Sequence, residues 1–137
     1  MQMLVISILA YIALIDLRTH RIPNREVLVL SIVSLTSVIA SGYSFRSHFL
    51  STLIVLVLSG LLSVFCGLGM GDVKLLGALA IFVLPPEIAS YKNFLFTVAI
   101  TATVHAIFLS RGDLRRSLQI PLAPAILCGT IATLILK

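Results

Sequence analysis

Six long apolar stretches constrain this chain more than any short motif does. They cover approximately residues 2–17, 27–44, 48–66, 74–90, 94–110 and 119–136. Each is close to the roughly 20 residues that a helix needs to cross about 30 Å of hydrocarbon. They lack the alternation of apolar and polar residues that is typical of membrane barrel strands. The pattern predicts an all-α polytopic membrane protein with about six transmembrane helices.

Composition supports lipid as the solvent of this chain. Of its 137 residues 59% are hydrophobic and 11% are charged, and the mean hydropathy is +1.15. So few charges cannot cover the apolar surface of a soluble domain of this size. The N-terminal run "MQMLVISILAYIALIDL" lacks the basic start and cleavage site of a signal peptide, so we expect it to be a retained first span. There is no repeat or long linker, and residues 1–137 are predicted to form a single domain.

The basic residues predict the orientation of the chain. The net charge of +5 comes from Lys and Arg residues scattered at the ends of apolar stretches, which favours membrane headgroups over nucleic acid as their partners. Seven of them lie around the connections between the first and second, third and fourth, and fifth and sixth stretches: Arg18, Arg21, Arg25, Lys74, Arg111, Arg115 and Arg116. The other three are Arg46, Lys92 and Lys137. Cytoplasmic loops carry an excess of Lys and Arg, so we expect the first group in the cytosol and both termini outside.

Two of the five acidic residues are predicted to lie at the cytosolic membrane face. Asp16 ends the first apolar stretch, and Asp72 lies in "GLGMGDVKLLG" at 67–77, which we expect to be a glycine-rich turn after the third stretch. An ionisable residue at membrane depth is costly, so a functional role is the first hypothesis. Gly69 and Gly71 would let another backbone approach closely. Together these residues favour a site for a peptide beside two carboxylates.

Less specific interpretations remain open on these residues alone. Asp72 could cap the fourth helix, with Lys74 as an interfacial anchor, and Asp16 could pair with a nearby arginine. The chain could then be a non-catalytic scaffold of a larger membrane assembly. Six helices with buried acids would also suit a small proton- or solute-coupled transport subunit, although transporter acids are expected near the bilayer midplane.

Three motifs resemble those of the type IV prepilin peptidases, which are membrane aspartic proteases of the GxGD type. "GMGDVKLLGALA" at 69–80 resembles the family's G-x-G-D-x-K motif, and "DLRTHRIPN" at 16–24 resembles its first motif. "IPLAPAI" at 120–126 resembles a proline-containing motif near the family's C-terminus. The chain lacks the paired CxxC motifs of the longer, bifunctional members. It resembles the short, peptidase-only form found in tight-adherence pilus systems, and methyltransferase activity is not expected.

The resemblance implies a function and a set of site residues. Asp16 and Asp72 would be the catalytic aspartates, and the remaining motif residues would shape the substrate loop: Gly69, Gly71, Lys74, Pro23 and Asn24. The substrate would be a prepilin or pseudopilin with a basic leader and an apolar N-terminal helix, cleaved at the cytosolic face of the bacterial inner membrane. Pilus or secretion assembly proteins are possible further partners. No cofactor or metal is expected.

The chemistry of the chain agrees with this hypothesis. Two close carboxylates can activate water and polarise a carbonyl, because one of them is forced to keep a proton. The residues leave open which aspartate holds it, since such a pair titrates as a unit. We expect Glu26 and Asp113 to be solvated in cytosolic loops, and Cys66 and Cys128 to be small core residues outside any metal or disulfide site.

Overall fold

The computed structural model describes residues 2–41, 45–66, 68–85, 87–110 and 121–135. Within these ranges the chain forms helices and no strand. The helices are α1 (Gln2–Thr19), α2 (Asn24–Ser41), α3 (Phe45–Cys66), α4 (Met70–Phe82), α5 (Ile88–Ser110) and α6 (Ala123–Ile135). The prediction of an all-α fold is therefore confirmed, and each predicted apolar stretch overlaps one helix except the fourth, which overlaps α4 and the start of α5.

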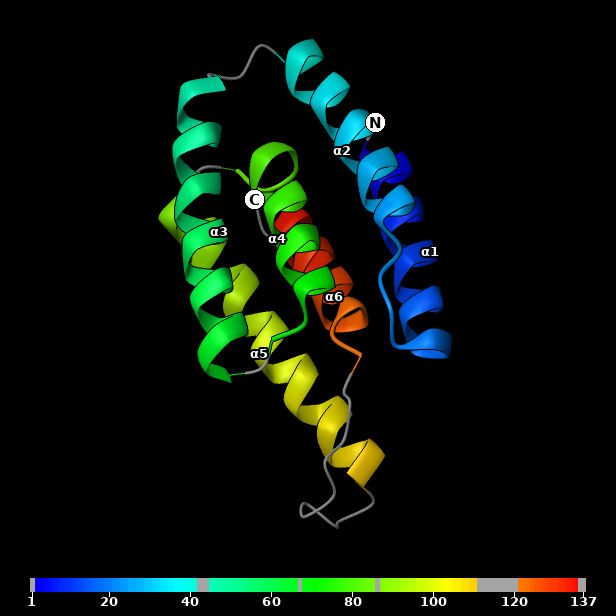
Figure 1. Ribbon diagram of the computed structural model, residues 1–137. Helices are drawn as coiled ribbons and strands as arrows, with labels where there is room; N and C mark the ends of the chain where they lie inside the picture. The colour runs from blue at the N-terminus through cyan, green and yellow to red at the C-terminus, as the bar shows by residue number, and fades with distance from the viewer. Residues whose placement is uncertain (1, 42–44, 67, 86, 111–120, 136–137) are drawn as a thin grey trace.

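The helices pack in the spatial order α5, α6, α1, α2, α4, α3, each against the next. In Figure 1, α4 and α6 occupy the middle of the bundle, with α3 on one side and α1 and α2 on the other. In that view the end of α1 and the starts of α2, α4 and α6 are the lower ends of these four helices. We call these ends together the acid end, because Asp16 lies in the last turns of α1 and Asp72 in the first turn of α4.

The fourth helix differs from the prediction at both of its ends. The apolar pattern indicated a helix over 74–90, but α4 spans Met70–Phe82 and residues 88–90 belong to α5. "LPPE" does end the fourth helix as predicted, since proline cannot supply the N–H that a continuing helix needs. At the other end, the expectation that Asp72 lies in a turn was wrong. The first turn of a helix favours acidic residues, so "GMGDVK" begins the helix rather than preceding it.

Four of the helices contribute most of the core, and Leu84 and Phe94 join it from the segment before α5 and from α5 itself. α1, α2, α4 and α6 contribute most of the core's fully buried apolar side chains, which include Leu9, Ile12, Leu30, Leu75, Leu79 and Ile126. By contrast, many large apolar side chains of α3 and α5 remain exposed, among them Leu62, Phe65 and Phe96. A surface of this kind is expected where lipid or another apolar partner is the neighbour.

Two helices are long and apolar enough to cross a membrane by length and composition, within the part of the chain that the structure describes. They cover Gln2–Thr19 and Arg46–Phe65, and Ala123–Ile135 is a shorter apolar helix. These helices are consistent with a membrane protein. Six spans, the single domain over 1–137 and the orientation of the chain remain predictions.

Candidate active site at the acid end

The end of α1 holds Asp16 in a defined position. Its side chain is buried, with 5% of its surface exposed. α1 ends through His20, which has a φ of 50° and whose backbone N–H donates to the carbonyl of Asp16 at 2.8 Å. A left-handed residue bonded in this way is a common helix ending, although glycine usually fills the position. The ending turns the chain sharply at His20, one helical turn after Asp16, so that the next residues lead directly into α2.

The start of α6 provides the hydrogen-bond donor to Asp16. The backbone N–H of Ala123 donates to Oδ2 of Asp16 at 3.1 Å. The first N–H groups of a helix have no partner within it, and together they carry a partial positive charge that attracts a carboxylate. Pro121 lies just before α6 and Pro124 in its first turn, where proline is well tolerated. The proline motif therefore begins the helix that holds Asp16.

Asp72 occupies the third position of α4 and faces back toward the start of that helix. Gly69 is the N-cap residue, in an extended conformation (φ −62°, ψ 137°). Its backbone N–H donates to the carboxylate of Asp72, which is half of the arrangement known as a capping box. A Cβ atom at Gly69 would lie 2.9 Å from Oδ2 of Asp72, so the missing side chain leaves room for the carboxylate.

The two aspartates are close enough to influence each other electrostatically. Asp72 lies in the first turn of α4, ahead of its apolar run and outside the two candidate membrane-spanning helices. Burial, followed by the negative charge of Asp16, raises the pKa of Asp72 to about 6, although the hydrogen bond from Gly69 opposes the change. Two carboxylates that share a site in this way resist being ionised together. The fold thus brings together the two acids that the sequence singled out.

The remaining motif residues join α2 to α4 beside the acids. A Cβ atom at Gly71 would lie 3.0 Å from Cβ of Ile22, so glycine is needed for the close approach of the two segments. Nζ of Lys74 donates to Oδ1 of Asn24 at 3.0 Å, which links the start of α4 to the start of α2. Pro23 precedes α2, and its carbonyl accepts a hydrogen bond from the N–H of Val27 at 3.4 Å. Each of the three quoted motifs thus contacts another motif at this end.

Several expectations about other residues need correction. Glu26 lies in the first turn of α2 rather than in a solvated loop, and its Oε2 is buried without a hydrogen-bond partner among the described residues. Cys128 is a free, exposed cysteine instead of a core residue. Asp113 and the side chain of Cys66 lie outside the described residues. In the described ranges, no group of three His, Cys, Asp or Glu side chains could hold a metal ion.

The role of the α6 start was missed at the level of the sequence. The proline motif was noted, but the backbone N–H of Ala123 was not identified as the partner of Asp16. A signal for it was present, because Pro121 and Pro124 are placed as prolines at a helix start usually are. The same holds for Ile22, whose contact with Gly71 depends on two segments that are 49 positions apart in the printed sequence.

Of the comparisons with known proteins, one identifies a family for this chain. The model of the type IV leader peptidase family matches residues 3–110, which include both aspartates and the glycine motif but not the proline motif. No match was found among curated proteins or among solved structures. The family match extends over most of the chain and includes the acids that the fold brings together. This chain is therefore a member of the type IV leader peptidase family.

Proposed function

We propose that this peptidase is an aspartic endopeptidase that removes the leader peptide from type IV pilin-like precursors. The observation that carries the proposal is the placement of Asp16 and Asp72, which come from α1 and α4 and share one partly buried site. The glycine motif, the first motif and the proline motif each contribute a contact at the acid end. The proposed setting is the cytosolic face of the bacterial inner membrane.

The two carboxylates would divide the work of hydrolysis. An ionised carboxylate takes a proton from water as the water oxygen attacks the scissile carbonyl carbon, while the protonated partner donates a hydrogen bond to the carbonyl oxygen. The tetrahedral intermediate then collapses, the C–N bond breaks, and the leaving nitrogen receives a proton from the pair. The raised pKa of Asp72 supports its role as the member that starts with the proton. The α6 start beside Asp16 supports a negative charge on Asp16.

The substrate class follows from the family and from the position of the acids. A pilin-like precursor has a basic leader followed by an apolar helix, so the bond between them lies where a membrane meets the cytosol. Asp16 and Asp72 lie at the ends of apolar helices, beside the exposed side chains of Arg18, Arg21 and Lys74. Basic residues at helix ends are expected at the cytosolic membrane surface. Other components of the pilus or secretion assembly would receive the mature subunit.

A non-catalytic scaffold is the second candidate, and one observation favours it. Both carboxylates accept hydrogen bonds from N–H groups at helix starts, as purely structural caps do. Capping alone does not explain why two carboxylates of the same charge lie close enough to repel each other, since such repulsion destabilises the fold. We therefore favour catalysis.

Precursor cleavage tests the proposed function directly. Membranes containing the protein are mixed with a tagged precursor that carries a basic leader and an apolar helix, and leader loss is followed by gel shift and by sequencing of the new N-terminus. We expect cleavage at the junction between leader and helix. Membranes from cells without the protein are the control. An intact precursor in both samples, with the peptidase correctly inserted, would contradict the proposal.

The proposed orientation has its own test. Single cysteines at Arg21 and Arg46, in a background without Cys66 and Cys128, should react with a membrane-impermeant thiol reagent from opposite sides. We expect position 21 to react from the cytosol and position 46 from outside. Labelling of both from one side would disprove the six-span arrangement.

A further inference from the structure

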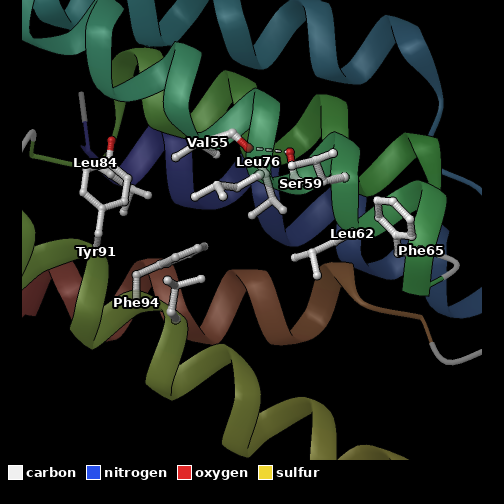
Figure 2. A pocket seen from close by; sticks show the side chains of 11 residues that line it. Val55, Ser59, Leu62, Phe65, Leu76, Leu84, Tyr91 and Phe94 are labelled. Carbon is white, nitrogen blue, oxygen red and sulfur yellow. Dashed lines mark hydrogen bonds between the residues drawn. The ribbon is translucent and has the colours of Figure 1, made fainter.

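An apolar groove separates α3 from α5 on one side of the bundle. Its volume is about 360 Å³. Figure 2 shows the side chains that line it, which come from α3, from Leu76 of α4, from Leu84 and from the first turns of α5. The polar groups among them are the hydroxyls of Ser59 and Tyr91, and both are hydrogen-bonded to backbone carbonyls, those of Val55 and Ala80. The groove therefore offers almost purely apolar surface.

The floor and the rims of the groove differ in exposure. Leu84 and Phe94 form a buried floor. Leu62, Phe65 and Leu95 form exposed rims on the two helices. A membrane provides little hydrophobic driving force between apolar surfaces, so binding there depends on filling such a hollow with well-packed atoms. The shape of the groove thus suits an occupant that projects side chains into it.

The groove begins beside the acid pair. Leu76 follows Asp72 by four residues, so the two side chains lie on the same face of α4, about 6 Å apart along the helix axis. Leu62, on the rim, accepts a hydrogen bond through its carbonyl from the N–H of Leu68, in the segment that leads to Asp72. From this end the groove runs along α3, away from the acids, to Leu84 and Tyr91 (Figure 2).

The length of the groove indicates an elongated occupant. On α3 it extends from Val55 to Phe65, which is about 15 Å of helix at 1.5 Å per residue. This corresponds to about three turns of an opposing helix. The volume is at the lower end of the range for pockets that enclose a small ligand, so it holds side chains from one helical face rather than a whole helix.

We propose that this groove binds the apolar helix of the precursor, in the part that follows the bond cut beside Asp72. The inference rests on the proposed function and adds to it the surface that holds the substrate. A chain cut at the acids must continue away from them into apolar surroundings, and the groove is the apolar path that starts one turn from Asp72. Side chains at positions i, i+3 and i+7 of the substrate helix would fill the hollow over Leu84 and Phe94.

Photo-crosslinking tests where the substrate helix lies. A benzophenone amino acid is placed at Leu62 on the rim, or at Val57 on α3 outside the groove, in the Asp16→Asn background so that the precursor stays intact. The two positions are matched, with 51% and 55% of the side chain exposed. We expect position 62, and not 57, to crosslink to the apolar segment of the precursor. Crosslinks from position 62 to lipid alone, or to a second copy of the peptidase, would overturn the inference.

Cleavage kinetics in the active protein provide the second measurement. Leu62→Trp places a larger side chain on the rim and so narrows the groove. We expect the apparent KM for the precursor to rise about 10-fold with little change in kcat, because a tenfold loss of affinity corresponds to only a modest loss of packing free energy. Val57→Trp should change both values less than about 2-fold. Equal effects of the two variants would overturn the proposal that the groove binds the substrate helix. They would leave the proposed peptidase activity unaffected. A wild-type protein that cleaves no precursor would overturn the proposed function and this inference with it.

Discussion

The two ends of α4 both carry polar contacts, but these contacts differ in kind. At the acid end, Asp72 lies close enough to Asp16 for the negative charge of Asp16 to raise the pKa of Asp72. At the opposite end, the hydroxyl of Tyr91 donates to the carbonyl of Ala80 at 3.4 Å, and the buried His48 ring also interacts with that carbonyl. The N–H of Leu84 bonds five residues back to Leu79, which leaves the Ala80 carbonyl accessible to these side chains.

This difference distinguishes a contact that stabilises the fold from a pair of groups that can serve catalysis. A carbonyl at a helix end needs donors, and Tyr91 supplies one, so this contact is explained by stability alone. Two neighbouring carboxylates repel each other, so their placement is not explained by stability. A protein keeps such an arrangement where it has a use for a shared proton. We therefore expect changes at the acid end to affect cleavage and changes at the far end to affect folding.

Variants of the proposed catalytic dyad, Asp16 and Asp72, should have the largest effect on cleavage. Asp16→Asn and Asp72→Asn each keep an oxygen that can accept the hydrogen bond from Ala123 or Gly69, but remove the ionisable group. We expect each to lower the cleavage rate at least about 1,000-fold, and the double variant to be little worse, because both groups act as one unit. Cleavage in membranes measures this.

Glu87→Gln is the control for the dyad. Glu87 is an exposed acid just before α5, at the other end of α4. We expect this variant to cleave the precursor like the wild type. Near-normal cleavage by either single dyad variant would mean that both aspartates act only as helix caps. The two ends of α4 would then not differ in function.

The second prediction concerns the contact between Gly71 and Ile22. Gly71→Val places a branched side chain where even a Cβ would lie 3.0 Å from Ile22. We expect at least about a 100-fold loss of cleavage, because a shift of about 1 Å is enough to misplace a catalytic group. Gly60→Val is the matched control, since a Cβ at Gly60 meets nothing within 4 Å. Equal cleavage by both variants would mean that the α2–α4 contact does not position Asp72.

The third prediction concerns the far end. Tyr91→Phe removes the hydroxyl that bonds to Ala80 and preserves the ring. We expect a loss of about 0.5–1 kcal/mol in the free energy of unfolding, typical of one hydrogen bond. At saturating precursor, cleavage per folded molecule should change less than about 2-fold, because the variant keeps the ring of Tyr91 that lines the proposed groove. Thermal unfolding in detergent and a cleavage assay on the same sample measure both quantities. A large loss of cleavage without a loss of stability would show that the two ends are not distinct in function.

The fourth prediction is the smallest and concerns the coupling itself. The charge of Asp16 is the second cause of the raised pKa of Asp72, after burial. Asp16→Asn should therefore lower the pKa of Asp72 from about 6, but not to its ordinary value, since burial remains. The carbonyl stretch of protonated Asp72, assigned by its loss in Asp72→Asn, can be followed against pH by infrared spectroscopy. An unchanged midpoint would show that the two carboxylates do not interact.

Much of this protein is determined by short-range features of its sequence. Six apolar stretches predict six helices, because a helix satisfies its own backbone hydrogen bonds in apolar surroundings. "LPPE" predicts the end of the fourth helix, because proline removes a donor. Asp16 and Asp72 are conspicuous in the sequence itself, since a carboxylate beside an apolar run is costly. The helix boundaries were less predictable, as the position of Asp72 shows, because a first helical turn and a glycine-rich turn favour the same residues.

The tertiary structure alone decided which groups meet. The bond from Ala123 to Asp16 joins residues 107 positions apart, and no local preference encodes such a distance. The same is true of the groove between α3 and α5, because the residues that line it form no sequence pattern that differs from that of other apolar helices. Apolar periodicity determines which face of a helix is buried. It does not determine which other helix that face packs against. That choice depends on how all six helices pack together, and on close approaches such as that of Gly71 to Ile22.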